Sequence, residues 1–426
     1  MKIDDLYKNF RNCSGVSTDT RKLQQDCMYF ALKGDNFDGN QFVQKAFDGG
    51  AKYCVVDDTE VIINTNCIYV EDVLTTLQNL ATYHRNAINI PIISLTGSNG
   101  KTTTKELINT VLASTYNVKA TVGNLNNHIG VPLTLLSFSE DLDFGIVEMG
   151  ANHQKEIDFL SGIAQPDYGL ITNFGKAHLE GFGSIEGVIK GKSELYDHLK
   201  ANEKTAFINT DDEKQVIQIG DYANISTFGT HLDNDCVITF DSANPYVTLI
   251  YDDIKIESQL IGDYNYGNIA VAVAIGKYFD VTSENIKKAI ESYQPANNRS
   301  EIIEKGSTKI ILDAYNANPT SMLAALHNLK QLNAENKYLF LGDMFELGAD
   351  AEKEHQEIVD FIEQNFQTHI HIIGKNFYKT NSNASIYKHS SFEDLKPILK
   401  DLDLNNATVL IKGSRGMALE RILDFI

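Results

Sequence analysis

The segment at residues 96–103, TGSNGKTT, combines residue types that can bind a chain of phosphates. Gly97 and Gly100 let the backbone curl so that several N–H groups converge on one anion, and a following helix adds the positive end of its dipole. Lys101 can reach the terminal phosphates, and the hydroxyl of Thr102 can bind Mg²⁺. We therefore expect ATP as a substrate, with Mg²⁺ as cofactor.

The loop is shorter than the general phosphate-binding pattern, which has a glycine where this chain has Leu95. A simple Gly-Asn turn followed by a solvated lysine is the alternative. That alternative does not explain why three threonines, Thr102 to Thr104, open a helix for which their propensity is low. The sequence favours a phosphate loop with these nucleotide-binding candidates: Thr96, Gly97, Ser98, Asn99, Gly100, Lys101, Thr102 and Thr103.

Two further polar residues follow predicted strands. Glu148 ends the apolar run 144–147, and His178 follows the run 169–172 after a short loop. In parallel α/β sheets, binding sites form at the carboxyl ends of the strands. Glu148 and His178 could join Thr102 as Mg²⁺ ligands, although a lone Glu or His is more often an ordinary surface residue.

Short β-rich runs alternate with helix-like runs, which predicts an α/β fold with mostly parallel sheets. A chain of 426 residues should divide into two or three domains, and the pattern suggests blocks at 1–86, 87–297 and 298–426. The expected strands are 27–32 and 52–56 in the first block, 92–95 at the start of the second, and 309–312, 338–341, 369–373 and 408–411 in the third. Helices are expected at 352–363 and 418–425.

Composition limits the kinds of partner. No apolar run could cross a membrane, the first residues do not resemble a secretory signal, and five scattered cysteines without CxxC spacing suggest reduced thiols. The net charge of −20, from 37 basic and 57 acidic residues, disfavours nucleic acid, so a phosphate site must be built locally. We expect a cytoplasmic monomer.

The loop and seven later segments, in the same order, resemble the Mur ligases, which are ATP-dependent amide-forming enzymes of peptidoglycan precursor synthesis. The resemblance spans nearly the whole chain. The segments are NLNNHIGVPLTLL (124–136), EMGANHQKEI (148–157), ITNFGKAHLEGFGS (171–184), GKSELYDHL (191–199), DAYNANPTSM (313–322), LGDMFELG (341–348) and KGSRGMALE (412–420).

This resemblance implies three domains: an N-terminal α/β domain that binds a UDP-sugar, a central P-loop ATPase-like domain and a C-terminal Rossmann-like domain. It assigns catalysis to Lys101, Glu148, His178 and Lys192. Lys192 lies in a helix-like run and would ordinarily be solvated, but the family implies that it is carbamylated and holds a second Mg²⁺. The implied metal ligands are thus Thr102, Glu148, His178 and the Lys192 carbamate.

The resemblance also assigns Asn268 and Arg299 to the nucleotide. Two neighbours depart from the family pattern, because Tyr264 stands where histidine is usual and Asn298 where glycine is usual. Asparagine tolerates left-handed backbone better than most residues, so the second change is mild.

The last three segments resemble those of family members that add D-alanyl-D-alanine to a UDP-N-acetylmuramoyl tripeptide. Amides and carboxylates at strand ends suit the dipeptide zwitterion, although the sequence NANP could simply form a turn. The implied dipeptide contacts are Asp313, Tyr315, Asn316, Asn318, Asp343 and Lys412. The implied contacts to the UDP-linked substrate are Ser17, Asp19, Arg21, Lys33, Gly34, Asn126, Asn127 and His128.

The implied reaction passes through an acyl phosphate. One alternative is another Mur-type ligase, or one like folylpolyglutamate synthase, with a different amine acceptor; the D-N-P-R segment of tripeptide-forming members does not occur here. A second alternative is a nucleotide-dependent switch without ligase activity. The presence of Glu148, His178, Lys192 and Asp343 argues against such a loss.

Overall fold

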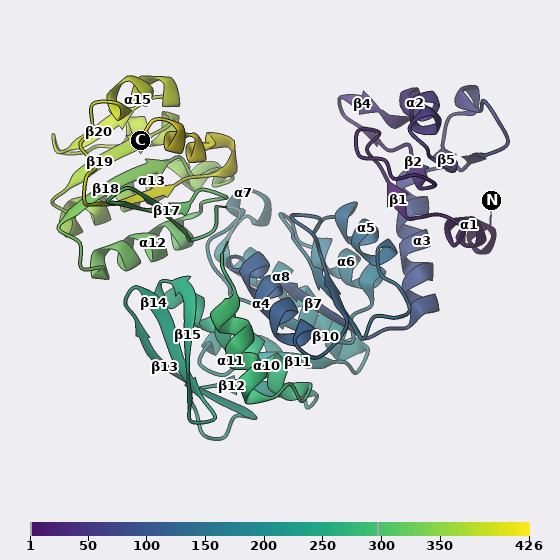
Figure 1. The fold of residues 1–426 in the computed structure, drawn as a ribbon, viewed down its shortest axis with the longest axis horizontal. Helices are drawn as coiled ribbons and strands as arrows, with labels where there is room; N and C mark the ends of the chain where they lie inside the picture. Colours follow the sequence, from purple (N-terminus) through teal and green to yellow (C-terminus); the bar gives the residue numbers. More distant parts are fainter. Residues whose placement is uncertain (1, 296–297) are drawn as a thin grey trace.

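The computed structural model describes residues 2–295 and 298–426, which form three α/β domains in succession along the molecule, each built on one large sheet (Figure 1). The predicted boundary between residues 297 and 298 adjoins residues 296–297, which lie outside the described residues. The mostly parallel α/β fold predicted from the sequence is confirmed. None of the described helices is long and apolar enough to span a membrane.

The first sheet has the strand order β1-β2-β5-β6, and all its pairings are parallel. The strands predicted at 27–32 and 52–56 correspond to its two central members. Its elements are α1 (Ile3–Phe10), β1 (Val16–Ser17), β2 (Met28–Phe30), the hairpin β3 (Lys33–Gly34) and β4 (Phe37–Asp38), the 3₁₀ helix η1 (Gly39–Phe42), α2 (Val43–Asp48), β5 (Tyr53–Val56), η2 (Thr59–Val61) and β6 (Cys67–Tyr69).

Helix α3 (Val73–Ile88) connects the first sheet to the second. The side chain of Asp72 caps its first turn by accepting a hydrogen bond from the Thr75 N–H, and Asn89 ends it in the left-handed conformation, with φ of 47°. Its buried face packs against helices α5 and α6 of the central domain. The boundary predicted between residues 86 and 87 therefore falls inside the last turn of this helix.

The central sheet has the order β15-β14-β13-β12-β11-β10-β7-β9-β8. It is parallel from β8 to β13, and β13 to β15 add an antiparallel extension that the sequence reading did not predict. Its strands are β7 (Ile92–Thr96), β8 (Val118–Ala120), β9 (Phe144–Glu148), β10 (Tyr168–Ile171), β11 (Thr205–Asn209), β12 (Ile225–Gly229), β13 (Cys236–Ala243), β14 (Tyr246–Tyr251) and β15 (Ile254–Ile261).

Helices cover both faces of this sheet. Helices α4 and α10 pack against each other, and their apolar residues share one core with β7, β9 and the antiparallel extension. The helices are α4 (Lys101–Ala113), α5 (Gly130–Leu136), α6 (Glu156–Ala164), α7 (Leu179–Phe182), α8 (Ile185–Ala201), α9 (Glu213–Ile219), η3 (Asp263–Asn265), α10 (Tyr266–Tyr278) and α11 (Ser283–Ser292).

The C-terminal sheet has the order β16-β17-β21-β18-β19-β20, with only β16 antiparallel. All four predicted strands are present, and the edge strands β16 and β20 are additional. The elements are β16 (Glu301–Lys305), β17 (Thr308–Asp313), α12 (Pro319–Gln331), β18 (Asn336–Gly342), η4 (Gly348–Asp350), α13 (Ala351–Asn365), β19 (His369–Ile373), α14 (Lys375–Lys379), β20 (Ile386–His389), α15 (Phe392–Leu399) and β21 (Ala407–Lys412).

The helix predicted at 418–425 was wrong in type. Ala418 adopts a left-handed conformation, with φ of 48°, and so separates two 3₁₀ helices, η5 (Arg415–Met417) and η6 (Leu419–Asp424). An interruption of this kind stops a continuous α-helix from forming. The helix predicted at 352–363 is confirmed as α13, which extends a little beyond both ends.

A buried histidine pair makes the stability of the C-terminal sheet depend on pH. Nδ1 of His371 lies 3.0 Å from Nε2 of His389, and burial lowers the pKa of both, that of His371 to about 4. Unfolded histidine titrates near pH ~6.5, so the folded state is favoured above that pH and loses stability as the pH falls toward 4.

We expect the free energy of unfolding to fall by up to about 3 kcal/mol between pH ~7.5 and pH ~4 through His371. Chemical denaturation at several pH values measures the change. A His371→Gln variant should flatten the pH dependence, whereas the same slope in the variant would show that other groups cause it.

Candidate functional site

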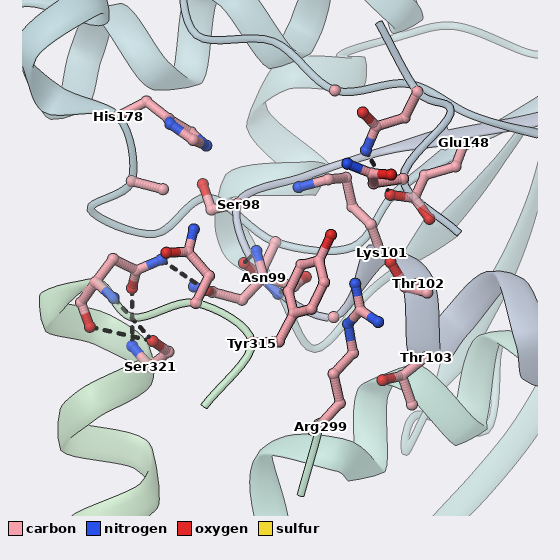
Figure 2. A pocket seen from close by; sticks show the side chains of 18 of the residues that line it. Ser98, Asn99, Lys101, Thr102, Thr103, Glu148, His178, Arg299, Tyr315 and Ser321 are labelled. Carbon is pink, nitrogen blue, oxygen red and sulfur yellow. Dashed lines mark hydrogen bonds between the residues drawn. The ribbon is translucent and has the colours of Figure 1, made fainter. Parts of the chain in front are cut away.

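A cavity of about 580 Å³ surrounds the loop between β7 and α4 and reaches the C-terminal domain (Figure 2). Predicted site residues of the central and C-terminal domains line this one cavity. Those that line it are Ser98, Asn99, Gly100, Lys101, Thr102, Thr103, Asn126, Asn127, His128, Glu148, His178, Asn268, Arg299, Asp313, Tyr315, Asn316, Asn318 and Lys412.

The loop has the geometry predicted for phosphate binding. Strand β7 is completely buried, and Gly97 and Gly100 have φ of 147° and 78°, values that side chains rarely allow. A Cβ atom on Gly97 would lie 2.0 Å from the Thr172 hydroxyl, and one on Gly100 would lie 2.4 Å from Oδ1 of Asn268. Both positions therefore require glycine for space as well as for conformation.

Lys101 begins helix α4 and folds back over the loop. Its ammonium donates a 2.8 Å hydrogen bond to the Gly97 carbonyl, and burial lowers its pKa while the charge of Glu148 opposes that change. The carbonyl is a neutral acceptor, so an incoming phosphate would be the stronger partner for this ammonium. When a phosphate binds, the ammonium can therefore exchange its hydrogen bond to the Gly97 carbonyl for one to the phosphate.

Glu148 is the last residue of β9 and is 1% exposed. Its Oε1 accepts a 2.8 Å hydrogen bond from Asn126 Nδ2, while its Oε2 has no hydrogen-bond partner among the described residues and lies 3.9 Å from Lys105 Nζ. A buried carboxylate oxygen without a partner is costly unless something binds it. Such an oxygen fits a Mg²⁺ ligand.

Two of the four predicted metal ligands lie apart from each other. His178 and Glu148 lie on opposite sides of Lys101 (Figure 2), and Nδ1 of His178 pairs with Glu346 Oε2 at 2.5 Å. Across the described residues, no three His, Cys, Asp or Glu side chains form a metal-binding group. Mg²⁺ often takes one or two carboxylates and completes its shell with phosphate and water, so Glu148 and Thr102 remain compatible with it.

Lys192 is fully buried in α8, so the solvated alternative is wrong for this residue. Its Nζ donates to the Ala151 carbonyl at 3.0 Å and lies 5.0 Å from the centre of the Phe182 ring. Burial, with the nearby Lys101 charge, lowers its pKa well below the usual range. A lowered pKa increases the fraction of neutral amine, the form that reacts with carbon dioxide, which suits the predicted carbamate, although Lys192 does not line the cavity.

Asn268 and Arg299, which the resemblance assigns to the nucleotide, both line the cavity. Asn268 accepts a 3.0 Å hydrogen bond from the Thr104 hydroxyl, which ties α10 to the phosphate-loop helix. The Arg299 guanidinium stacks 3.5 Å from the centre of the Tyr315 ring. Asn298 has φ of 60°, the left-handed conformation that a glycine would otherwise supply.

The C-terminal domain contributes a largely buried ion pair to the cavity wall. Lys412 Nζ lies 2.5 Å from Asp313 Oδ2, and Lys412 is 1% exposed. Asn318 caps α12 by accepting from the Ser321 N–H and also donates a 2.7 Å hydrogen bond to Asn99 Oδ1. The cap fixes which end of the Asn318 amide faces Asn99.

Asp343 is separate from this group. Its two carboxylate oxygens accept hydrogen bonds from the N–H groups of Asn376 and Phe377 at the start of α14, and it does not line the cavity. Both oxygens are already bound, so this geometry gives Asp343 a structural contact rather than a substrate contact.

The residues predicted in the first sheet also lie outside the cavity. Arg21 pairs with Asp19 at 2.8 Å, and Lys33 pairs with Asp57 at 2.9 Å. Ser17 ends β1 and Gly34 ends β3. Their role with the UDP-linked substrate stays a prediction.

Sequence reasoning missed the loop that fastens the C-terminal domain to the central one. Lys176 Nζ lies 2.6 Å from Glu354 Oε1, and its N–H donates to the Thr320 hydroxyl. His178 and Glu346, which pair across the same boundary, both have left-handed backbone. No local pattern marks these partners, because each contact joins residues more than 140 positions apart.

Known proteins match nearly the whole length of the chain. Family models match at residues 12–96 (Mur ligase family, catalytic domain), 95–276 (Mur ligase middle domain) and 298–415 (Mur ligase, glutamate ligase domain). The UDP-N-acetylmuramoyl-tripeptide–D-alanyl-D-alanine ligases of Bacillus subtilis and Escherichia coli are 35% and 32% identical, each match covering 96% of this chain and 92% of the relative.

Solved structures give the same result. A crystal structure of MurF from Acinetobacter baumannii is similar, with a TM-score of 0.85 at 30% identity over 96% of this chain and 92% of that one. MurF ligase from Thermotoga maritima in complex with ADP has a TM-score of 0.85 at 25% identity, over 98% of this chain and 97% of that one.

Proposed function

The chain belongs to the Mur ligase family, and we propose from this membership and the site geometry that it joins D-alanyl-D-alanine to a UDP-N-acetylmuramoyl tripeptide. The reaction consumes ATP and forms ADP. The observation that carries the proposal is that one cavity is lined both by the phosphate loop, with Lys101, and by the Asp313–Lys412 pair. With ATP at the loop and the dipeptide at this pair, both would lie within reach of one carboxylate in the same cavity.

In the first step, an oxygen of the tripeptide's terminal carboxylate attacks the γ-phosphorus of ATP, the bond to the β-phosphate oxygen breaks, and ADP leaves. The dipeptide amine then attacks the acyl carbon, inorganic phosphate departs, and the amine loses a proton. Two anions meet in the first step, so charge neutralisation is the main catalytic demand. Lys101 and Arg299 supply positive charge at the cavity wall.

Mg²⁺ fits the same place as a cofactor. Glu148 Oε2 and the Thr102 hydroxyl would hold it, and it would neutralise phosphate charge. The two other expected ligands, His178 and a carbamate on Lys192, remain part of the proposal.

In the same cavity, Asp313 and Lys412 provide the charges that a dipeptide zwitterion needs. Asp313 accepts hydrogen bonds from an ammonium, and Lys412 donates to a carboxylate. The amides of Asn316 and Asn318, beside Tyr315, offer further donors and acceptors along the same wall. Enclosure by two domains limits water, which would otherwise hydrolyse an acyl phosphate.

The compartment and assembly belong to the proposal as well. Free thiols at all five cysteines suit the reducing cytoplasm. One chain provides both walls of the cavity, so a monomer is sufficient for the reaction.

Phosphate release tests the function. With ATP and UDP-N-acetylmuramoyl tripeptide, we expect steady release only when D-alanyl-D-alanine is added, with one amide formed for each ATP consumed. Glutamate and diaminopimelate serve as alternative amines. Equal release without any amine would contradict the ligase, and a preference for glutamate would favour an enzyme like folylpolyglutamate synthase.

A further inference from the structure

Tyr264 joins the central domain to the first residues of the C-terminal domain. It lies in η3, lines the cavity, and its hydroxyl is 2.9 Å from the Ser300 hydroxyl. Gly262 makes this placement possible, because a Cβ at that position would lie 2.3 Å from the Tyr264 ring. Burial raises the pKa of Tyr264, so its hydroxyl keeps its proton at neutral pH.

Ser300 in turn contacts the dipeptide wall, by which we mean the Asp313–Lys412 pair. Its backbone N–H donates to Asp313 Oδ1 at 3.2 Å, and the other oxygen of Asp313 pairs with Lys412. Ser300 is 7% exposed and has φ of 50°, a left-handed conformation that costs free energy for a serine. A residue in that conformation needs contacts that hold it, and the Tyr264 hydroxyl is its side-chain partner.

In the central domain, Tyr264 is next in sequence to a residue that contacts Asn268, which is assigned to the nucleotide. Its neighbour Asn265 accepts a 2.8 Å hydrogen bond from Asn268 Nδ2, and Asn268 accepts from the Thr104 hydroxyl on the phosphate-loop helix. A continuous series of contacts therefore runs from α4 through η3 and Ser300 to Asp313. Buried polar networks that are fully paired hold their members in one arrangement.

We propose that Tyr264 is a positioning residue for the amine acceptor: through Ser300 it holds Asp313 in the orientation that receives D-alanyl-D-alanine opposite the nucleotide. This inference rests on the proposed function, because it takes Asp313 and Lys412 as the dipeptide contacts. Tyr264 itself need not touch the dipeptide. It sets the position of a carboxylate that does.

The test removes one oxygen atom. In a Tyr264→Phe variant the ring still fills its place, and we expect the KM for D-alanyl-D-alanine to rise about tenfold, as for loss of a hydrogen bond in a buried network. The KM for ATP and kcat at saturating dipeptide should stay within about twofold. Calorimetric binding of D-alanyl-D-alanine, in the presence of a non-hydrolysable ATP analogue, should weaken by the same factor.

Tyr266→Phe is the matched control. Tyr266 is two residues away, and its hydroxyl donates a 2.8 Å hydrogen bond to the Ile238 carbonyl instead of to the C-terminal domain. Its loss should leave both KM values unchanged. Ser300→Ala should reproduce the effect of Tyr264→Phe, and the double variant should be no worse than either single variant, because both changes break the same contact.

Equal dipeptide affinities in the Tyr264→Phe and Tyr266→Phe variants would overturn the inference, as would a rise confined to the KM for ATP. Additive effects of Tyr264→Phe and Ser300→Ala would also overturn it. Failure of the unmodified protein to ligate would instead contradict the proposed function, so the two failures are distinct.

Discussion

A Lys101→Ala variant should form the amide about 10²- to 10³-fold more slowly at saturating substrates, the cost typical of removing one group that stabilises transition-state charge. Lys101 is the cation at the start of α4, and the only side-chain hydrogen bond that it forms within the described residues is to the Gly97 carbonyl of its own loop. It holds no other element in place. Its removal should therefore affect the reaction much more than the fold.

Initial rates of ADP formation, with ATP and both other substrates saturating, measure this loss. Lys353→Ala is a suitable control, because Lys353 lies on the surface of α13 with a side chain 70% exposed. Thermal unfolding should show both variants folded. A ligation rate near that of the unmodified protein would mean that the loop does not bind the phosphates of ATP.

Lys412→Met should both destabilise the C-terminal domain and weaken dipeptide binding. The substitution leaves Asp313 charged without its partner in a largely buried place, and breaking such a pair costs about 3 kcal/mol or more. It also removes the cation assigned to the dipeptide carboxylate. Chemical denaturation gives the stability change, and the KM for D-alanyl-D-alanine gives the binding change.

A second substitution separates these two effects. Adding Asp313→Asn to Lys412→Met removes the uncompensated charge, so most of the lost free energy of unfolding should return. Ligation should not recover, because neither charge for the zwitterion remains. A double variant as unstable as the single one would show that the ion pair is not the cause, and recovery of ligation would contradict the assignment of the dipeptide wall.

Local patterns allowed the phosphate loop and the main strands to be predicted. The glycine spacing, the apolar run before Gly97 and the threonines after Lys101 lie within a short stretch of sequence, so they could be recognised together. The position of Glu148 follows from the strand that it ends. The same holds for the strands of the C-terminal sheet, whose central members are apolar and uninterrupted.

Contacts between distant segments could not be predicted in this way. Asp343 was placed with the dipeptide because its motif is close to a strand end, but the turn into α14, which returns 33 residues later, occupies its carboxylate. Lys192 gave no sign of burial within its own helix. The pairing of Tyr264 with Ser300 depends on how two domains meet, which no periodicity reports.

In the loop that fastens the two domains, Lys176 forms an ion pair with Glu354, and its backbone N–H donates a hydrogen bond to the Thr320 hydroxyl. Ion pairs that reach solvent weaken as dissolved salt screens them, and the Lys176 side chain is 42% exposed. The contribution of the Lys176–Glu354 pair to the contact between the two domains therefore weakens as ionic strength rises.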